Sequence, residues 1–321
     1  MNYDLKIYFV ENFHGIQYFL SIIDPKEKNL IITSGNPHLE KFLDEILPEQ
    51  ERLIIPRIPS YRFFVLPFLL LLWRWKYSKI LARKDVHKAY FFSKGNNIHF
   101  FAVLAQLQKS KCDIYFIDGS GGKFIETPVD ETSLLQKLYN LILGICCGQD
   151  LIRYKCWGWI HFGLKHFNNF ETVRLLEWEK IAKKFNLPTE KVNNAVLIVD
   201  GPIQDIPGVD ISKTQKKLVK YFSENLKKQI HIKPHIHSNI TSFLGTSLEN
   251  KVKTLPRHIP AELIILKYDE IYFFASAACY GQNNKKLYSL SKMLIFESAE
   301  AELNYWKLFN DYYQSESVVL L

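Results

Sequence analysis

The first half of the chain alternates short apolar runs with stretches of helical periodicity. The apolar runs read LKIYFV, NLIITS, KAYFFS and DIYFID, and they begin at residues 5, 29, 88 and 113. Helical patterns follow the first three runs, over 15–23, 37–47 and 97–108. Continuous apolar strands separated by helices are typical of a parallel sheet that is covered on both faces. The pattern therefore predicts a Rossmann-like α/β domain.

A second α/β pattern begins after the break NLPTEKVNN, which spans residues 186–194. Strand-like runs at 195–201 and 229–235 enclose a helical pattern over 212–228, and 262–278 predicts a short helix and a further strand. The tail, 291–314, reads as strand-like and then helical. We therefore expect an N-terminal domain over 1–188 and a C-terminal domain over 189–321. The C-terminal helix either stays in its own domain or packs back on the first.

Three further segments fit neither pattern as clearly. Residues 134–169 are aromatic and helical without alternation, so they form either core or an interface, and the oligomeric state stays open. The run over 169–185 predicts an amphipathic helix. Residues 63–79 hold about a dozen apolar residues, fewer than the roughly 20 that a membrane span needs, followed by tryptophans and cations. This segment is either a buried helix with a basic end or an interfacial helix on an anionic membrane.

Composition narrows the class of partner. The chain carries 41 Lys and Arg against 33 Asp and Glu, a formal charge of +8, which favours acidic partners. No zinc-finger, RNA-recognition or basic-arm pattern is visible, so nucleic acid is not expected. Five cysteines without a CxxC pair indicate reduced, packed thiols and a cytoplasmic protein. The N-terminal pattern does not predict a signal peptide.

Polar residues that can bind a ligand or transfer a proton stand directly after the predicted strands, where open α/β sheets bind their ligands. Asp118 follows DIYFI and opens a loop with Gly119 and Ser120, in which the backbone can approach a ligand closely. The loop matches neither a P-loop nor a dinucleotide fingerprint. Asp200 and Asp205 hold similar positions after 195–199, and there we expect an ordinary turn.

The stretch HIKPHIHS, residues 231–238, concentrates histidines at the end of a strand. His231, Lys233 and His235 alternate along it, so they are expected to share one side. A cation among the would-be ligands argues against zinc and leaves two interpretations: a phosphate-handling site or a polar strand end. His231 is expected to lie deeper in the strand than His235.

Two further polar positions follow along the chain. Pro260 precedes Glu262 at the start of a predicted helix, where a carboxylate either binds ribose hydroxyls or simply favours the helix terminus. Ser276 ends a strand and, with the backbone N–H groups from Ala277 onward, forms a natural phosphate binder. The less specific interpretation is a small residue at a strand end.

The ordered set of these motifs resembles the bacterial sialyltransferases of the two-domain GT-B kind, which make lipooligosaccharide, capsule and polysialic acid. The family's acidic-Gly motif is similar to Asp118-Gly119, and its Lys-x-His motif to Lys233-Pro234-His235. Its Pro-x-Glu helix start resembles Pro260 to Glu262, and its serine motif resembles Ala275-Ser276. The resemblance covers residues 113 to 278. The chain departs from the family pattern at Ile117, Ile236 and Ala275.

The resemblance implies a fold and an activity. The fold is GT-B, with two facing Rossmann-like domains and a central cleft. The activity is inverting transfer of sialic acid, or a related nonulosonic acid, from a CMP-sugar donor to a hydroxyl of lipooligosaccharide or capsule. No metal and no cofactor are expected, and 63–79 would hold the enzyme at the inner face of the cytoplasmic membrane.

The resemblance also implies a role for each site residue. Asp118 would be the general base and His235 the leaving-group acid. The residues implied to bind the nucleotide-sugar are Lys233, Glu262, Ser276, Gly119, Ser120, Pro260 and Ala277. Two alternatives stay open: a GT-B transferase that uses a UDP- or GDP-sugar, and a non-catalytic protein on the same fold that binds glycans or a membrane surface.

Overall fold

The computed structural model divides the chain into two compact units, Met1–Glu177 and Trp178–Leu321, each described here by itself. The sequence placed the division after residue 188. The structure describes residues 5–56, 65–82, 86–92, 98–109, 112–117, 127–128, 133–156, 159–164, 173–201, 203–236, 241–274, 276–279, 282, 284–313 and 318–321.

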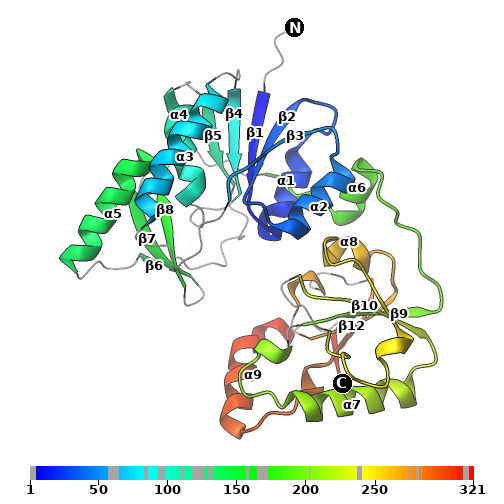
Figure 1. The fold of residues 1–321 in the computed structure, drawn as a ribbon. Helices are drawn as coiled ribbons and strands as arrows, with labels where there is room; N and C mark the ends of the chain where they lie inside the picture. Colours follow the sequence, from blue (N-terminus) through cyan, green and yellow to red (C-terminus); the bar gives the residue numbers. More distant parts are fainter. Residues whose placement is uncertain are drawn as a thin grey trace. The chain divides into compact units, whose positions relative to one another are not determined.

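The first unit is built on a parallel sheet with the strand order β3-β2-β1-β4-β5 (Figure 1). Its strands are β1 (Leu5–Val10), β2 (Asn29–Thr33), β3 (Glu51–Ile54), β4 (Val86–Phe91) and β5 (Asp113–Phe116). The predicted parallel sheet is thus confirmed. The short strand β3 was not predicted, because only two of its four residues are apolar and none of them is fully buried.

Helices cover both faces of this sheet. The helices α3 (Leu66–Leu81), α4 (Ile98–Lys109) and α5 (Leu134–Cys147) share one core with Phe9 and Phe91, whose rings stack at 3.9 Å between centroids. On the other face, Phe19 of α1 (Ile16–Ile22) packs edge-on against Tyr8, and α2 (Pro37–Ile46) lies beside α1 (Figure 1). Alternate residues of β1 therefore supply two different cores, as a sheet covered on both faces requires.

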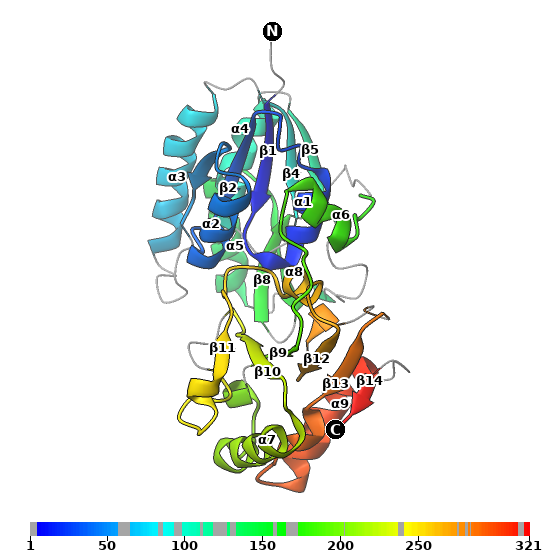
Figure 2. The same cartoon turned by 90° about the vertical axis from the view of Figure 1, so that its right-hand side faces the viewer.

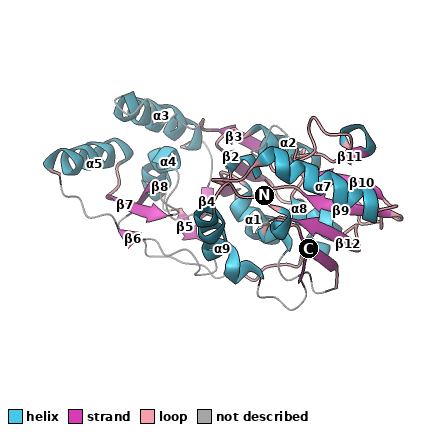
Figure 3. Ribbon diagram, turned by 90° about the horizontal axis from the view of Figure 1, so that it is seen from below, coloured by secondary structure: helices cyan, strands magenta, loops and turns pink. Residues whose placement is uncertain are grey.

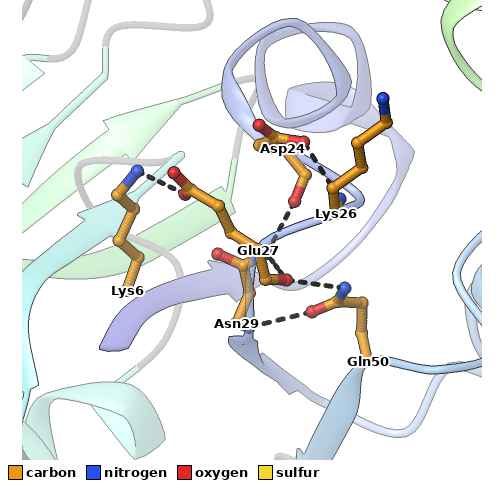
Figure 4. Close-up of polar contacts among 6 residues, drawn as sticks. All are labelled: Lys6, Asp24, Lys26, Glu27, Asn29 and Gln50. Carbon is orange, nitrogen blue, oxygen red and sulfur yellow. Dashed lines mark hydrogen bonds and ion pairs between the residues drawn. The ribbon is translucent and has the colours of Figure 1, made fainter. Parts of the chain in front are cut away.

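Polar contacts fasten the start of β2 to its surroundings (Figure 4). Asn29 donates from its side chain to the carbonyl oxygens of Asp24 and Glu27, and the Gln50 side chain accepts from the Asn29 backbone N–H at 2.9 Å. Lys6 pairs with the Glu27 carboxylate at 2.6 Å. These bonds lie at the amino ends of the strands, so the opposite edge of the sheet is the one left for ligands.

The second unit holds a six-stranded parallel sheet in the order β11-β10-β9-β12-β13-β14 (Figure 2). Its strands are β9 (Ala195–Val199), β10 (Gln229–Lys233), β11 (Val252–Thr254), β12 (Glu270–Phe273), β13 (Lys286–Ser289) and β14 (Val318–Leu320). Counted from the first strand of the unit, this is the order 3-2-1-4-5-6 of the nucleotide-binding Rossmann fold. The order reverses between β9 and β12, so these two strands flank the topological switch point.

Two cores hold the second sheet. Helix α7 (Ile211–Asn225) and helix α9 (Ala299–Tyr313) pack on one face through Phe222 and Tyr305, together with Ile232 of β10. The short helix α8 (Ala261–Ile265) packs on the other face, and α6 (Trp178–Lys184) contacts α8. The one-turn 3-10 helices of this unit are Ile203–Asp205, Glu249–Lys251, Ala277–Cys279 and Ser291–Met293.

Three predicted elements are wrong. Residues 151–164 form antiparallel strands β7 (Leu151–Cys156) and β8 (Trp159–Leu164), with β7 also paired to β6 (Thr127–Pro128), instead of continuing a helix. Described residues 173–177 are not helical, because Leu176 is held by hydrogen bonds with Gln17 and Ser21 of α1. The expected strand near 291–296 is a one-turn 3-10 helix.

The 63–79 segment is a helix from residue 66 onward, and it has two different sides. Leu70, Trp73 and Tyr77 are buried in the first core, whereas Phe68 and Trp75 are exposed. The buried side agrees with the interpretation as a core helix, and the interfacial interpretation stays a prediction. None of the described helices is long and apolar enough to span a bilayer.

Candidate functional site

Lys233 is the last residue of β10, and it is only 2% exposed. Its ammonium group donates to the carbonyl oxygen of Pro234 at 2.9 Å and to that of Arg257 at 3.2 Å. The pKa of Lys233 is lowered to about 8. Burial is the main cause, the Glu262 carboxylate opposes it, and the positive charge of Arg257 adds to it. Lys233 therefore joins the end of β10 to the segment that leads into α8.

Glu262 is the second residue of α8, directly after Pro260 at the N-cap and Ala261. Burial raises the pKa of Glu262, while its own backbone N–H and the Lys233 ammonium lower it. The negative charge of Glu262 also raises the pKa of the Cys279 thiol, after the larger effect of burial. One carboxylate thus acts on groups at the ends of both β10 and β12.

Ser276 follows β12 and begins the turn that closes with the 3-10 helix Ala277–Cys279. Its carbonyl oxygen accepts from the Cys279 backbone N–H at 3.2 Å, and its side chain hydrogen-bonds the Cys279 thiol. Lys233, Glu262 and Ser276 are far apart in the sequence, and their shared neighbours bring them to one edge of the sheet. That edge holds the carboxyl ends of the strands, where open α/β sheets bind ligands.

Asp200 follows β9 at the same edge, and it is not the ordinary turn residue that the sequence predicted. The Asp200 carboxylate is 4% exposed and accepts both the backbone N–H of Ser242, at 2.8 Å, and the Ser242 hydroxyl. Its own backbone N–H donates to the Lys233 carbonyl oxygen at 3.0 Å. Burial raises the pKa of Asp200 to about 6, against the opposing hydrogen bonds of Ser242 and Gly201. Asp200 therefore hydrogen-bonds both Lys233, before the 234–241 segment, and Ser242, after it.

The histidines of HIKPHIHS separate as their positions suggested. His231 is 4% exposed within β10, its Nδ1 lies 2.5 Å from the Tyr268 hydroxyl oxygen, and its Nε2 has no hydrogen-bond partner. His231 and Lys233 share the face of the sheet opposite Ile232. His235 lies two residues past the strand, half-buried. His237 lies outside the described residues.

Strand β5 leads directly to the acidic-Gly motif. Ile117 is buried and extends the pairing of β5 by donating to the Phe91 carbonyl oxygen at 2.8 Å, so position 118 follows a strand as predicted. Asp118, Gly119 and Ser120 themselves lie outside the described residues, as does Ala275. Among the residues that the structure describes, no group of three His, Cys, Asp or Glu side chains could hold a metal ion.

Sequence reasoning missed two residues of this edge. Arg257 is half-buried, its carbonyl oxygen holds Lys233, and its charge acts on the same ammonium group. Ser242 is buried against Asp200. Arg257 stands three residues before Pro260, and this proximity to a motif was the signal that could have found it. Ser242 has no comparable signal, because it lies in a loop without periodicity.

No family model matches the sequence, and no curated protein matches it. Solved structures share its fold. The chain is 11% identical to the 2,6-sialyltransferase of Photobacterium sp. JT-ISH-224, solved in a ternary complex with the donor product CMP and the acceptor substrate lactose. That likeness covers 99% of this chain and 78% of the other, with a TM-score of 0.52.

A second solved structure is the UDP-GlcNAc 2-epimerase of Methanocaldococcus jannaschii. It is 12% identical, the match covers 99% of this chain and 88% of the other, and the TM-score is 0.50. Identities this low establish the fold alone. The chain has the GT-B fold, the two-unit α/β architecture of a large class of glycosyltransferases.

Proposed function

We propose that this protein is an inverting glycosyltransferase that moves a nonulosonic acid, such as sialic acid, from a CMP-sugar to a hydroxyl of a surface glycan. The observation that carries the proposal is the convergence of Lys233, Glu262 and the Ser276 turn at the carboxyl edge of the second sheet. These residues supply a cation, a carboxylate and a hydroxyl next to the switch point, which suits a ribose and a phosphate.

The chemical step needs a base and a charge-stabilising group. In the proposed reaction Asp118 accepts the proton of the acceptor hydroxyl, and that oxygen attacks the anomeric carbon from the face opposite the nucleotide. The bond to the CMP phosphate oxygen breaks as the new bond forms, through an oxocarbenium-like state. His235 donates a proton or a hydrogen bond to the departing phosphate.

The leaving group carries negative charge, and the second unit offers cations for it. Lys233 is buried and already donates to two carbonyl oxygens, so its contribution to phosphate binding is mainly its charge and the positions of its neighbours. Arg257, half-buried beside it, is the cation that we add to the sequence-derived set. With the Ser276 hydroxyl, these groups would stabilise the departing phosphate without a metal ion. Glu262 would accept hydrogen bonds from the ribose.

The acceptor proposed is a glycan of lipooligosaccharide or capsule. Such acceptors are assembled on lipid, which would place the enzyme at the inner face of the cytoplasmic membrane. The formal charge of +8 favours an anionic surface of this kind. Lactose, the acceptor named in the Photobacterium complex, is a practical first substrate.

A UDP-sugar enzyme is the rival function, because the epimerase with the same fold has UDP-GlcNAc in its name. Thermal unfolding in the presence of CMP, UDP or GDP separates the two. We expect CMP at 100 times its Kd to stabilise the protein by about 2.7 kcal/mol, and UDP and GDP to have no effect. Stabilisation by UDP or GDP without stabilisation by CMP would sink the proposal.

Two kinds of variant then assign the roles. Glu262→Gln should weaken CMP binding, whereas Glu300→Gln, an exposed residue at the start of α9, serves as the matched control. Asp118→Ala and His235→Ala should each lower transfer from CMP-sialic acid by about 100-fold or more, measured by mass spectrometry of the product. Unchanged transfer in both would mean that the catalytic assignment is wrong.

A further inference from the structure

Two helices of the first unit expose an unusual amount of apolar surface. Among the described residues, 17 large apolar side chains are exposed, and 11 of them lie on α3 with its preceding residue and on α5. They are Val65, Phe68, Leu71, Leu72 and Trp75 on the first helix, and Leu134, Leu135, Leu138, Leu141, Ile142 and Ile145 on the second. Phe68 is 73% and Leu134 is 83% exposed. Apolar patches of this kind mark interaction sites.

The exposed residues form one stripe on each helix. On α5 they recur at steps of three and four from Leu134 to Ile145, while Leu143 and Cys147 on the opposite side are buried. On α3 the stripe from Phe68 to Trp75 has the same spacing, opposite the buried Leu70. Each helix is therefore apolar on two sides, and a helix of that kind is normally covered on both.

The two helices are neighbours in the fold. Helix α3 packs against both α4 and α5, and all three lie together in Figure 3. Arg74 of α3 donates to the Ile145 carbonyl oxygen at 3.1 Å and to that of Cys146 at 3.4 Å. The sequence had offered a membrane surface as one of two interpretations of 63–79 and had left 134–169 undecided, whereas the structure joins α5 to the same layer.

The charge of this layer has a single sign. Helices α3, α4 and α5 contain no Asp or Glu, although these residues make up 33 of the 321 residues of the chain. Their charged residues are Arg74, Lys76, Lys79, Lys109 and Lys137. These helices therefore present cations beside apolar stripes and no acids. That combination is complementary to a lipid bilayer with anionic headgroups above an apolar interior.

An open pocket of about 400 Å³ lies between α3 and α4 within this layer. Leu71, Trp75 and Ala105 contribute its apolar wall, and Arg74, Lys79 and Lys109 contribute cations. The Lys79 ammonium lies 3.8 Å from the centre of the Trp75 ring, which is 61% exposed. Tryptophan paired with lysine is the combination that membrane-surface helices place at the level of lipid headgroups.

We propose that the outward faces of α3 and α5 dock on a bilayer containing anionic phospholipid, with a lipid phosphate held in the pocket between α3 and α4. The helices lie on the bilayer, because 16 and 14 residues are too few to cross it. A second copy of the chain fits this face poorly. In a two-fold dimer the same patch meets itself, so the exposed lysines of these helices would face lysines, with no acid in these helices to pair with.

Vesicle sedimentation with the full chain tests the docking face. Vesicles of phosphatidylcholine alone are compared with vesicles in which about a third of the lipid is phosphatidylglycerol. We expect binding to the anionic vesicles that weakens as salt is added. Leu138→Gln with Leu141→Gln, both on the exposed side of α5, should weaken binding at least about tenfold. Lys79→Glu with Lys109→Glu should weaken it about tenfold or more.

Matched controls lie in the second unit. Leu303→Gln replaces an exposed leucine of α9, and Lys220→Glu replaces an exposed lysine of α7; both should bind vesicles as the unchanged protein does. Circular dichroism checks that each variant is folded. The proposal is overturned if the protein binds both vesicle types equally. It is also overturned if the α5 variant binds anionic vesicles as well as the unchanged protein does. A dimer that the α5 substitutions convert to monomer while vesicle binding stays the same overturns it too. None of these outcomes depends on the proposed sugar transfer.

Discussion

The ammonium group of Lys233 should give nucleotide binding a dependence on pH. Its pKa is lowered to about 8, so it is charged at pH 7 and mostly neutral at pH 9. The CMP phosphate has a second pKa of about 6, so it is already mostly doubly ionised at pH 7 and changes its charge little up to pH 9. We expect the affinity for CMP, measured by calorimetry, to fall by up to about tenfold between pH 7 and pH 9.

A second lysine with a similar pKa makes a control necessary. Burial lowers the pKa of Lys285 to about 8 as well, but its ammonium group donates to the carbonyl oxygens of Leu266 and Tyr268, before β12 begins. Lys233→Gln should therefore abolish the pH dependence while Lys285 remains. If Lys233→Gln keeps the same pH profile, then Lys233 is not its source.

At the residue scale, the sequence indicated which residues lie at the edge of the sheet, but not how deeply each side chain is buried or what it hydrogen-bonds. The rule that ligands bind after strands selected Lys233 and Ser276, and the helix start after Pro260 selected Glu262; the fold then brings all three to one edge. The same rule gave no way to distinguish Asp200, a buried acceptor of two Ser242 hydrogen bonds, from an ordinary turn. Burial of a polar side chain depends on a partner distant in the chain, and a local pattern does not contain that information.

At the element scale, the end of α5 depends on a glycine. Gly148 has φ +69°, its N–H bonds to the Ile145 carbonyl oxygen, and the next N–H reaches Gly144, which is a Schellman motif. A Cβ on Gly148 would lie 3.0 Å from the Arg74 guanidinium. Gly148→Ala should therefore lower the free energy of unfolding by about 1 kcal/mol from the backbone and by about 1 kcal/mol more from the Arg74 hydrogen bonds.

Gly245 provides the comparison for this effect. It has φ +75°, and a Cβ there would meet nothing within 4 Å. Gly245→Ala should cost only the backbone strain, so chemical denaturation of the two variants isolates the contact between α3 and α5. Equal costs in the two variants would show that Arg74 moves aside without loss.

Regular elements were predictable where periodicity was strong, and unpredictable where tertiary contacts decide. The strands β1, β2, β9 and β10 and the helix α7 lie where the pattern placed them. The hairpin of β7 and β8 was taken for helix, since its aromatic residues fit either structure and pairing with β6 is a non-local event. Residues 173–177 are not helical as predicted, because Leu176 forms hydrogen bonds with Gln17 and Ser21 of α1.

At the scale of the whole molecule, each unit has its own core. The core that the first sheet shares with α3, α4 and α5 uses residues from 7 to 147, and both cores of the second sheet use residues after 191. Calorimetry should therefore show two unfolding transitions. CMP should raise the temperature of one transition, by several degrees at 100 times its Kd, and leave the other unchanged. A single transition with equal calorimetric and van't Hoff enthalpies would contradict this independence.

The two-unit α/β architecture followed from the sequence because alternating strands and helices leave few topologies open. The order 3-2-1-4-5-6 did not follow, since short strands such as β11, β13 and β14 carry too little pattern to be recognised. The division of the chain depends likewise on contacts, because α6 packs on α8 of the second unit.

The hydrogen bonds at the end of β10 have a consequence for recognition. Lys233 donates to the Pro234 and Arg257 carbonyl oxygens, and Asp200 accepts from Ser242, so the protein itself fixes these groups. The framework around this edge is thus preorganised, and a ligand that arrives there loses little free energy to the ordering of side chains. Few contacts would then suffice for tight binding. Association at this edge should be fast, and ligands should differ mainly in their dissociation rates.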